Sequence, residues 1–181
     1  MRNLSITSRY IVTAFIVVLV TWLLHEFAHW ATSELFGYSS TMSLNSSSAL
    51  NPEEVDKTHH IYISAAGPLI TILQGFLAYF LLKRFWSKTL YLFLFIAFYM
   101  RLMAGLMNVI TPNDEGRISE FLSLGTYTIP ALVSALLFYW VYRVSKKHRL
   151  TNRFHLITIF IVMVFTSVLI LTDQFFKVIL L

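Results

Sequence analysis

The sequence predicts an all-α integral membrane protein with about five membrane-spanning helices, on two observations. Of its 181 residues, 57% are hydrophobic and only 13% are charged, whereas soluble domains carry about 25% charged residues. The apolar residues also gather into long runs, and a helix needs about 20 such residues to cross a bilayer. We expect the spans at residues 10–36, 61–82, 89–110, 127–144 and 154–176.

These runs leave no room for a separate soluble domain. We therefore expect residues 1–181 to form a single membrane domain, with core motifs in 10–125 and additional helices in 127–181. The net charge of +5 does not indicate nucleic-acid binding, because the basic residues stand in short loops, where they orient helices. The chain has no cysteine, which excludes disulfides and thiolate metal ligands.

The first span carries the sequence His25-Glu26-Phe27-Ala28-His29, an HExxH motif. Ionisable side chains are costly in hydrocarbon, so their presence there indicates a functional site. Residues four apart share one face of a helix, so both imidazoles can reach one metal ion. Glu26 lies beside that face, where it can deprotonate a metal-bound water, as in HExxH metallohydrolases.

A polar stretch rich in serine and asparagine, residues 37–60, follows the first span. Within it, residues 41–45 alternate polar and apolar side chains, which fits a short strand or hairpin at the membrane interface. A plain flexible loop fits the same residues equally well. His59 and His60 end this stretch, and neighbouring side chains point in different directions, so we expect them at the interface rather than on a metal.

The second span has a face of small residues, because Gly67, Thr71 and Gly75 recur every four positions. Such a face lets another helix approach closely. We expect either plain packing or, more specifically, a face that packs behind the metal-binding helix and sets its position.

A catalytic zinc usually has three protein ligands and a water, so the two histidines need one more. Asp114 is the preferred candidate, because it follows the third span at the same predicted level as His29, beyond the helix-interrupting Pro112. Glu115 is its main rival. In the alternative interpretation, Asp114 is the N-cap of a short helix over residues 115–124.

Arg101 lies midway along the third span, and a buried guanidinium needs an anionic partner. The candidates are Asp114, Glu115 and Glu120. We expect a structural ion pair, which can also orient the Asp114 loop.

Charge placement predicts an orientation. Ten of the fourteen lysines and arginines flank the N-terminus and the second–third and fourth–fifth connections. By the positive-inside rule this side is cytoplasmic. We therefore predict a multi-pass protein with its N-terminus inside, its C-terminus outside and His25 nearer the outer leaflet.

Three segments in this order, residues 25–29, Ala65-Ala66-Gly67-Pro68 and residues 108–116, resemble the site-2 protease family of intramembrane zinc metalloproteases. In that family an HExxH helix, a Gly-Pro helix and a later Asn/Pro-rich segment with an Asp-Gly motif build the catalytic core. The resemblance covers about the first two thirds of the chain.

The resemblance implies His25, His29 and Asp114 as zinc ligands, Glu26 as general base and Asn108 near the substrate. The chain departs from the family pattern elsewhere. Thr71 stands where the family often has asparagine, Asn108 is four residues before the proline, and the aspartate is followed by glutamate rather than glycine. Many bacterial members also open their site toward the cytoplasmic face, opposite to the orientation predicted from charge.

The expected function is hydrolysis of peptide bonds in transmembrane or membrane-proximal substrates by a zinc-activated water. The partners would be a membrane protein or peptide and the lipid bilayer, and residues 41–45 would hold the substrate extended by edge pairing. The alternative is a non-proteolytic metal-binding membrane protein, either a transporter or a scaffold, and a lipid hydrolase would use similar zinc chemistry. The almost purely apolar fourth span argues against transport.

Overall fold

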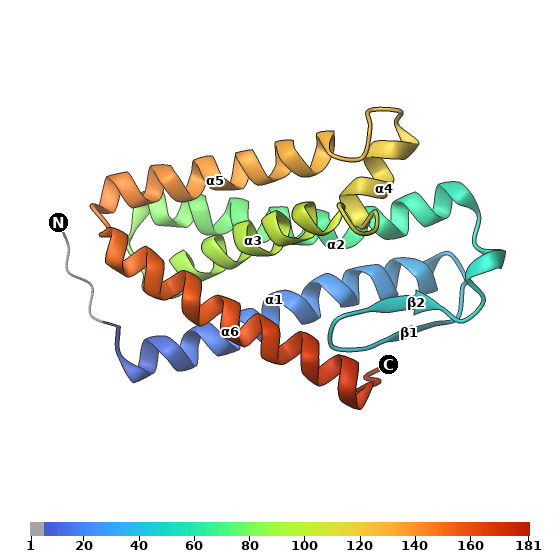
Figure 1. The fold of residues 1–181 in the computed structure, drawn as a ribbon, viewed down its shortest axis with the longest axis horizontal. Helices are drawn as coiled ribbons and strands as arrows, with labels where there is room; N and C mark the ends of the chain where they lie inside the picture. Colours follow the sequence, from blue (N-terminus) through green and yellow to red (C-terminus); the bar gives the residue numbers. More distant parts are fainter. Residues whose placement is uncertain (1–5) are drawn as a thin grey trace.

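The computed structural model describes residues 6–181, and most of these residues are helical (Figure 1). In chain order the elements are α1 (Ser8–Leu35), β1 (Ser40–Met42), β2 (Ser47–Ala49), the 3-10 turn η1 (Pro52–Glu54), α2 (Lys57–Arg84), α3 (Lys88–Met107), α4 (Asp114–Phe121), α5 (Thr128–His148) and α6 (Asn152–Phe176).

Five helices, α1, α2, α3, α5 and α6, are long and apolar enough to cross a membrane. They coincide with the five predicted runs, although α2 begins four residues before its apolar run. The early start has a local cause, because the Asp56 carboxylate accepts hydrogen bonds from the backbone N–H groups of Thr58 and His59. An N-cap of this kind satisfies helix donors that would otherwise lack partners.

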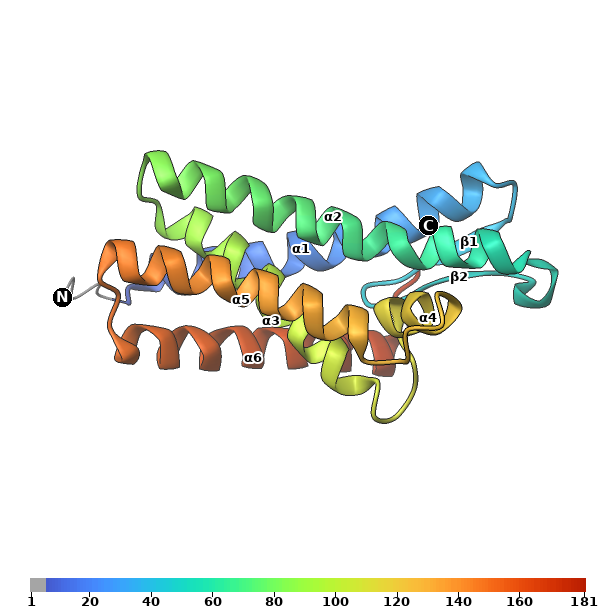
Figure 2. The ribbon, with the colours of Figure 1, turned by 90° about the horizontal axis from the view of Figure 1, so that it is seen from above.

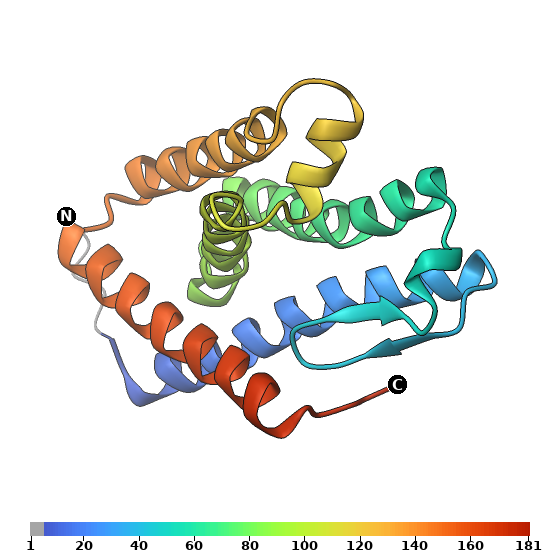
Figure 3. The same ribbon diagram turned by 45° about the vertical axis from the view of Figure 1, so that its right-hand side comes forward.

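The helices pack around α3, which lies in the middle of the bundle (Figures 2 and 3). α1 and α2 pack against each other and against α3, α5 packs on α3 and α2, and α6 packs on α1. Buried apolar side chains from all five long helices form one core cluster, whose fully covered members include Leu82, Tyr91 and Ile96. This core fixes how α1 and α2 meet, and that meeting positions the site.

The polar stretch after α1 forms an antiparallel hairpin, in which Ser40 pairs with Ala49 and Met42 with Ser47. The prediction of a strand or hairpin was therefore confirmed, and the flexible-loop alternative was wrong. The chain's last residues extend this sheet on the β1 side, because Met42 N–H donates to the Leu181 carbonyl and Leu180 N–H donates to the Met42 carbonyl.

Two helices anchor the tip of the hairpin. Trp22 Nε1 in α1 donates to Asn45 Oδ1 at 2.8 Å. In α6 the Asp173 carboxylate accepts from Ser43 Oγ at 2.8 Å and from Leu44 N at 3.0 Å. Three residues are too few for a self-supporting strand pair, so these contacts hold the hairpin against the bundle.

Charge divides between the two ends of the bundle. The start of α1 and the α2–α3 and α5–α6 turns share one end, which carries the basic clusters 83–88 and 143–153 (Figure 1). The hairpin and α4 lie at the other end, and every aspartate and glutamate falls in that half. The placement agrees with alternating passes, while the direction of the chain across a membrane stays a prediction.

Candidate metal centre

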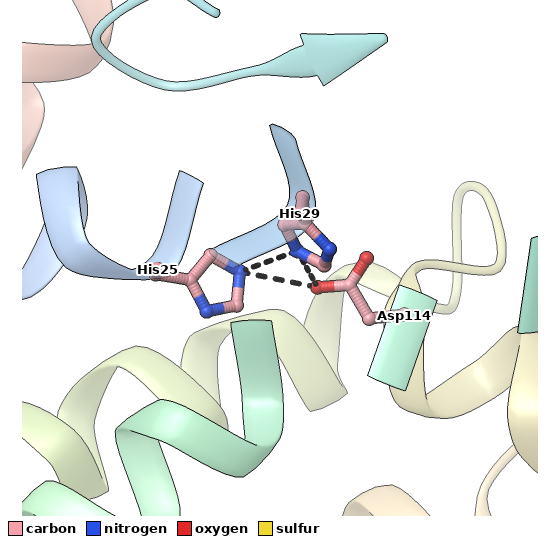
Figure 4. A group of neighbouring side chains, drawn as sticks. All are labelled: His25, His29 and Asp114. Carbon is pink, nitrogen blue, oxygen red and sulfur yellow. Dashed lines mark hydrogen bonds and ion pairs between the residues drawn. The ribbon is translucent and has the colours of Figure 1, made fainter. Parts of the chain in front are cut away.

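His25 and His29 of α1 and Asp114 of α4 bring three ligand atoms together (Figure 4). His25 Nε2 lies 3.2 Å from Asp114 Oδ2, and His29 Nε2 lies 3.4 Å from the same oxygen. The two Nε2 atoms are 3.1 Å apart. Both histidines are buried and the aspartate is partly buried, so the group can hold a metal ion out of bulk water.

The outer nitrogens of the imidazoles fix which ring atoms face the centre. His29 Nδ1 lies 2.6 Å from the Ile63 carbonyl oxygen, which can only accept, so Nδ1 carries the proton. His25 Nδ1 lies 3.2 Å from Thr71 Oγ1, whose own proton goes to the Gly67 carbonyl, so Nδ1 donates here as well. Each neutral ring therefore turns the lone pair of Nε2 toward Asp114, the tautomer that metal ligation requires.

Two lone pairs and a carboxylate oxygen facing one another need a cation between them, either a proton or a metal ion. Tetrahedral ligands at about 2.0–2.1 Å from a zinc ion lie roughly 3.3 Å from one another. The observed separations of 3.1, 3.2 and 3.4 Å match that spacing. The donor set and its geometry thus fit a metal ion that is held by three protein ligands.

The carboxylate is in the charge state that a ligand needs. Burial would raise the pKa of Asp114, but a proton shared between its carboxylate and the Nε2 atoms of His25 and His29 outweighs burial and holds that pKa well below its usual range. Metal ligands must be deprotonated, and Asp114 meets this condition.

The small-residue face of α2 lies directly against the two imidazoles. A Cβ atom added at Gly67 would overlap His29 Nε2 and would stand only 2.7 Å from His25 Nδ1. Only glycine leaves room for both rings at this position. The close approach predicted for this face is therefore found at Gly67 and Thr71, which lie behind the two histidines of α1, whereas Gly75 faces α3 and α5.

Asn108 shapes the turn that delivers Asp114. Its Oδ1 accepts from Asn113 N–H at 2.8 Å, and its Nδ2 donates to the carbonyls of Ala104 and Gly105 at 3.3 and 3.2 Å. It is buried and does not line the cleft described below. Its contacts are therefore with the turn that leads to Asp114, not with the space where the resemblance implies a substrate.

Arg101 forms an ion pair with Glu115, the alternative candidate for the third metal ligand. Its Nη1 lies 3.0 Å from Glu115 Oε1 and 3.8 Å from Asp114 Oδ2, and both Arg101 and Glu115 are almost fully buried. Glu115 is therefore held by a guanidinium rather than by the histidine pair. The short helix expected at residues 115–124 is α4, and it begins at Asp114 with Asn113 as its N-cap, so Asp114 is not the cap.

A cleft of about 530 Å³ opens in front of His25, His29 and Asp114. Glu26 lines it, and within residues 6–181 its carboxylate makes no hydrogen bond and no ion pair. The remaining lining comes from α1, α2, α4 and the hairpin, namely Ser33, Asn45, Ser46, Ser47, Ser48, Ala49, Pro52, Val55, His60, Ile63, Ser64 and Arg117. The carboxylate is thus free to act on a molecule held beside the ligands.

Sequence reasoning missed His60, Ser64 and Arg117 as cleft residues. A signal existed for the first two, because positions 60 and 64 continue the Gly67–Thr71 face toward the start of α2 at helical spacing. Arg117 is three residues after Asp114, and its Nη1 lies 3.8 Å from Asp114 Oδ1. No local pattern indicated that this arginine would face the cleft.

Fold and site together define a helical protein with five helices of membrane-spanning length and a buried two-histidine, one-aspartate group suited to a metal ion. No protein-family model, curated protein or solved structure matches the chain. The functional argument therefore depends on the site itself.

Proposed function

We propose that this protein is an intramembrane zinc metalloprotease of the site-2 protease type, which hydrolyses peptide bonds of transmembrane or membrane-proximal substrates. One observation carries the proposal. Two lone-pair nitrogens and one carboxylate oxygen converge on a common point, beside the buried Glu26 carboxylate, which forms no hydrogen bond or ion pair within residues 6–181. The resemblance of the three sequence segments supports the same class.

Zinc is the metal that best fits this donor set. Imidazole nitrogens and one carboxylate in a tetrahedral arrangement suit zinc, and three protein ligands leave a coordination position open for catalysis. When bound, a zinc ion supplies a Lewis acid that polarises a carbonyl and lowers the pKa of water.

Different residues of the protein would then have separate roles in the reaction. His25, His29 and Asp114 would hold the ion, while Ile63 and Thr71 fix the orientation of the imidazoles. Glu26 takes a proton from the attacking water and returns it to the departing amine, the general base and acid of the reaction.

The hairpin offers a place for an extended substrate. Ser43 N–H donates to the Ser46 carbonyl, and Leu50 N–H donates to the Ser39 carbonyl. Hydrogen-bonded and non-hydrogen-bonded residue pairs alternate along an antiparallel ladder, so the main-chain groups of Ser47 point away from β1. That edge of β2 lines the cleft. An unwound substrate segment would pair there as an added strand, with its carbonyl presented to the metal.

The alternative functions fit less well. A transporter needs polar groups along a path through the bundle, but the side chains buried toward the basic end are mostly apolar, such as Leu82, Leu92 and Ile96. A scaffold would not require a buried carboxylate at Glu26 that forms no hydrogen bond or ion pair within residues 6–181. A lipid hydrolase has no use for a free strand edge beside the ligands.

The test compares wild-type protein with Glu26→Gln in liposomes that contain a library of single-span peptides. Mass spectrometry detects new peptide termini, and elemental analysis measures zinc. We expect Glu26→Gln to keep zinc and to lose cleavage by at least 100-fold. His25→Ala is the matched comparison and should lose both. Cleavage by Glu26→Gln at the wild-type rate would contradict the proposal.

A further inference from the structure

A second cavity, far from the metal centre, opens between three helices at the basic end of the bundle. It has a volume of about 520 Å³, within the usual range for sites that bind small molecules. Its lining residues come from α3, α5, α6 and the α5–α6 turn, namely Phe95, Phe98, Phe138, Val141, Tyr142, Ser145, Lys146, Arg149, Leu150, Asn152, His155 and Ile159.

The cavity exists because α5 and α6 pack on different neighbours. α5 lies on α3 and α2, whereas α6 lies on α1, so the two helices diverge from the turn that joins them. Figure 3 shows α5 and α6 diverging from the turn that joins them. All three helices are of membrane-spanning length, so in a bilayer the space between α5 and α6 would be accessible to lipid.

The inner wall of the cavity is aromatic and aliphatic. Phe95 and Phe98 of α3 form its back, with ring centroids 6.2 Å apart, and Phe138 of α5 lies 5.7 Å from Phe98. Phe138 is 55% exposed and Ile159 of α6 is 41% exposed. A surface of this kind accommodates hydrocarbon rather than a free polar solute.

The rim of the cavity is cationic and lacks a counter-charge. Lys146 Nζ lies 5.6 Å from the Tyr142 ring centroid, and Arg149 follows at the end of α5. Within residues 6–181, neither side chain forms an ion pair with a carboxylate. Every acidic residue lies in the opposite half of the bundle, so this positive charge is not neutralised by the protein.

We propose that this cavity binds one anionic phospholipid, with an acyl chain along the Phe95–Phe98–Phe138 wall and the phosphate between Lys146 and Arg149. An apolar groove with a basic mouth at the end of spanning helices matches both parts of such a lipid. The unpaired charge selects an anionic headgroup over a zwitterionic one. The site is independent of the proposed hydrolytic function.

The experiment measures lipid binding to the full-length protein in detergent by native mass spectrometry. The probes are dioleoyl phosphatidylglycerol and dioleoyl phosphatidylcholine, which share their acyl chains and differ in charge. One lysine or arginine near an anionic headgroup contributes about 5-fold in affinity, so we expect roughly 30-fold tighter binding of phosphatidylglycerol.

Two variants of equal net charge separate the site from general surface charge. Lys146→Gln/Arg149→Asn should abolish the preference, and asparagine suits the left-handed backbone at position 149, where φ is 52°. Arg143→Gln/Arg153→Gln removes two cations from the same end but outside the cavity and should keep the preference. Ile159→Trp should weaken binding of both lipids by filling the groove.

Three results would overturn the proposal. The first is equal affinity of the wild-type protein for the two lipids. The second is an equal loss of preference in both charge variants, which would indicate surface attraction alone. The third is complete displacement of the lipid by millimolar inorganic phosphate, which would indicate an anion site without an acyl groove.

Discussion

The two ends of the helix bundle bury different kinds of side chain. At the hairpin end many of the buried groups are polar or charged, and several of them contact one another around His25, His29 and Asp114. At the basic end the buried groups are mostly apolar, with isolated pairs such as Tyr10 and Thr158, whose hydroxyls are 2.9 Å apart.

This difference shows that the two ends contribute differently to the stability of the fold. Burying a polar group without a partner costs about 1–3 kcal/mol, so a membrane protein keeps such groups only where they serve a purpose. The basic end stabilises the bundle by packing, and the hairpin end uses that rigidity to hold three acceptor atoms close together. A change of packing at the basic end should therefore alter stability without altering metal binding.

The largest effect on the metal centre should come from Gly67→Ala. The new Cβ would overlap both imidazoles, so we expect metal affinity to fall by at least 100-fold. Gly75→Ala is the control in the same helix, because its Cβ would lie away from the imidazoles, 2.8 Å from the end of the Leu137 side chain and 3.5 Å from Ala97 Cβ. Isothermal titration with zinc measures both, and wild-type affinity in Gly67→Ala would show that the rings do not sit against α2.

Arg101→Met should cause the largest loss of stability at the hairpin end. It leaves the buried Glu115 carboxylate without its partner, and breaking a buried ion pair costs about 3–5 kcal/mol. Denaturant titration in detergent measures the change. The double variant Arg101→Met/Glu115→Gln should recover most of the loss, and failure to recover would mean that Arg101 acts mainly through Asp114.

Asn108→Leu should weaken metal binding by about 10-fold, because it frees the turn before Asp114. The exposed Asn51, which bonds only to Glu54 on the surface, provides the control variant Asn51→Leu with unchanged affinity. If Asn108→Leu instead kept zinc affinity but changed the cleavage-site preference, Asn108 would contact substrate as the family resemblance implies.

Tyr10→Phe should have the smallest effect on stability, and it tests whether the two ends act independently. It removes one hydrogen bond to Thr158 in the apolar core, which is worth about 0.5–1.5 kcal/mol. Zinc affinity should stay unchanged. A drop in zinc affinity would show that the basic end is coupled to the site and that the two regions do not act separately.

The sequence predicted the helices, and it also predicted that His25, His29 and Asp114 would come together, because these signals are local or scarce. Long apolar runs define spans, and a fixed helical spacing brings His25 and His29 to one face. Asp114 could be chosen because few ionisable residues lie near the membrane depth predicted for His29. The roles of Asn108, Arg117 and Asp173 could not be predicted, since each depends on how elements distant in sequence meet.

The central claim is that His25 Nε2, His29 Nε2 and Asp114 Oδ2 bind one metal ion. X-ray absorption spectroscopy of zinc-loaded Glu26→Gln protein tests it directly. We expect one zinc per chain with nitrogen and oxygen ligands at about 2.0–2.1 Å, including two imidazoles, and loss of this signal in Asp114→Ala. Zinc that is absent, or bound identically in Asp114→Ala, would contradict the account.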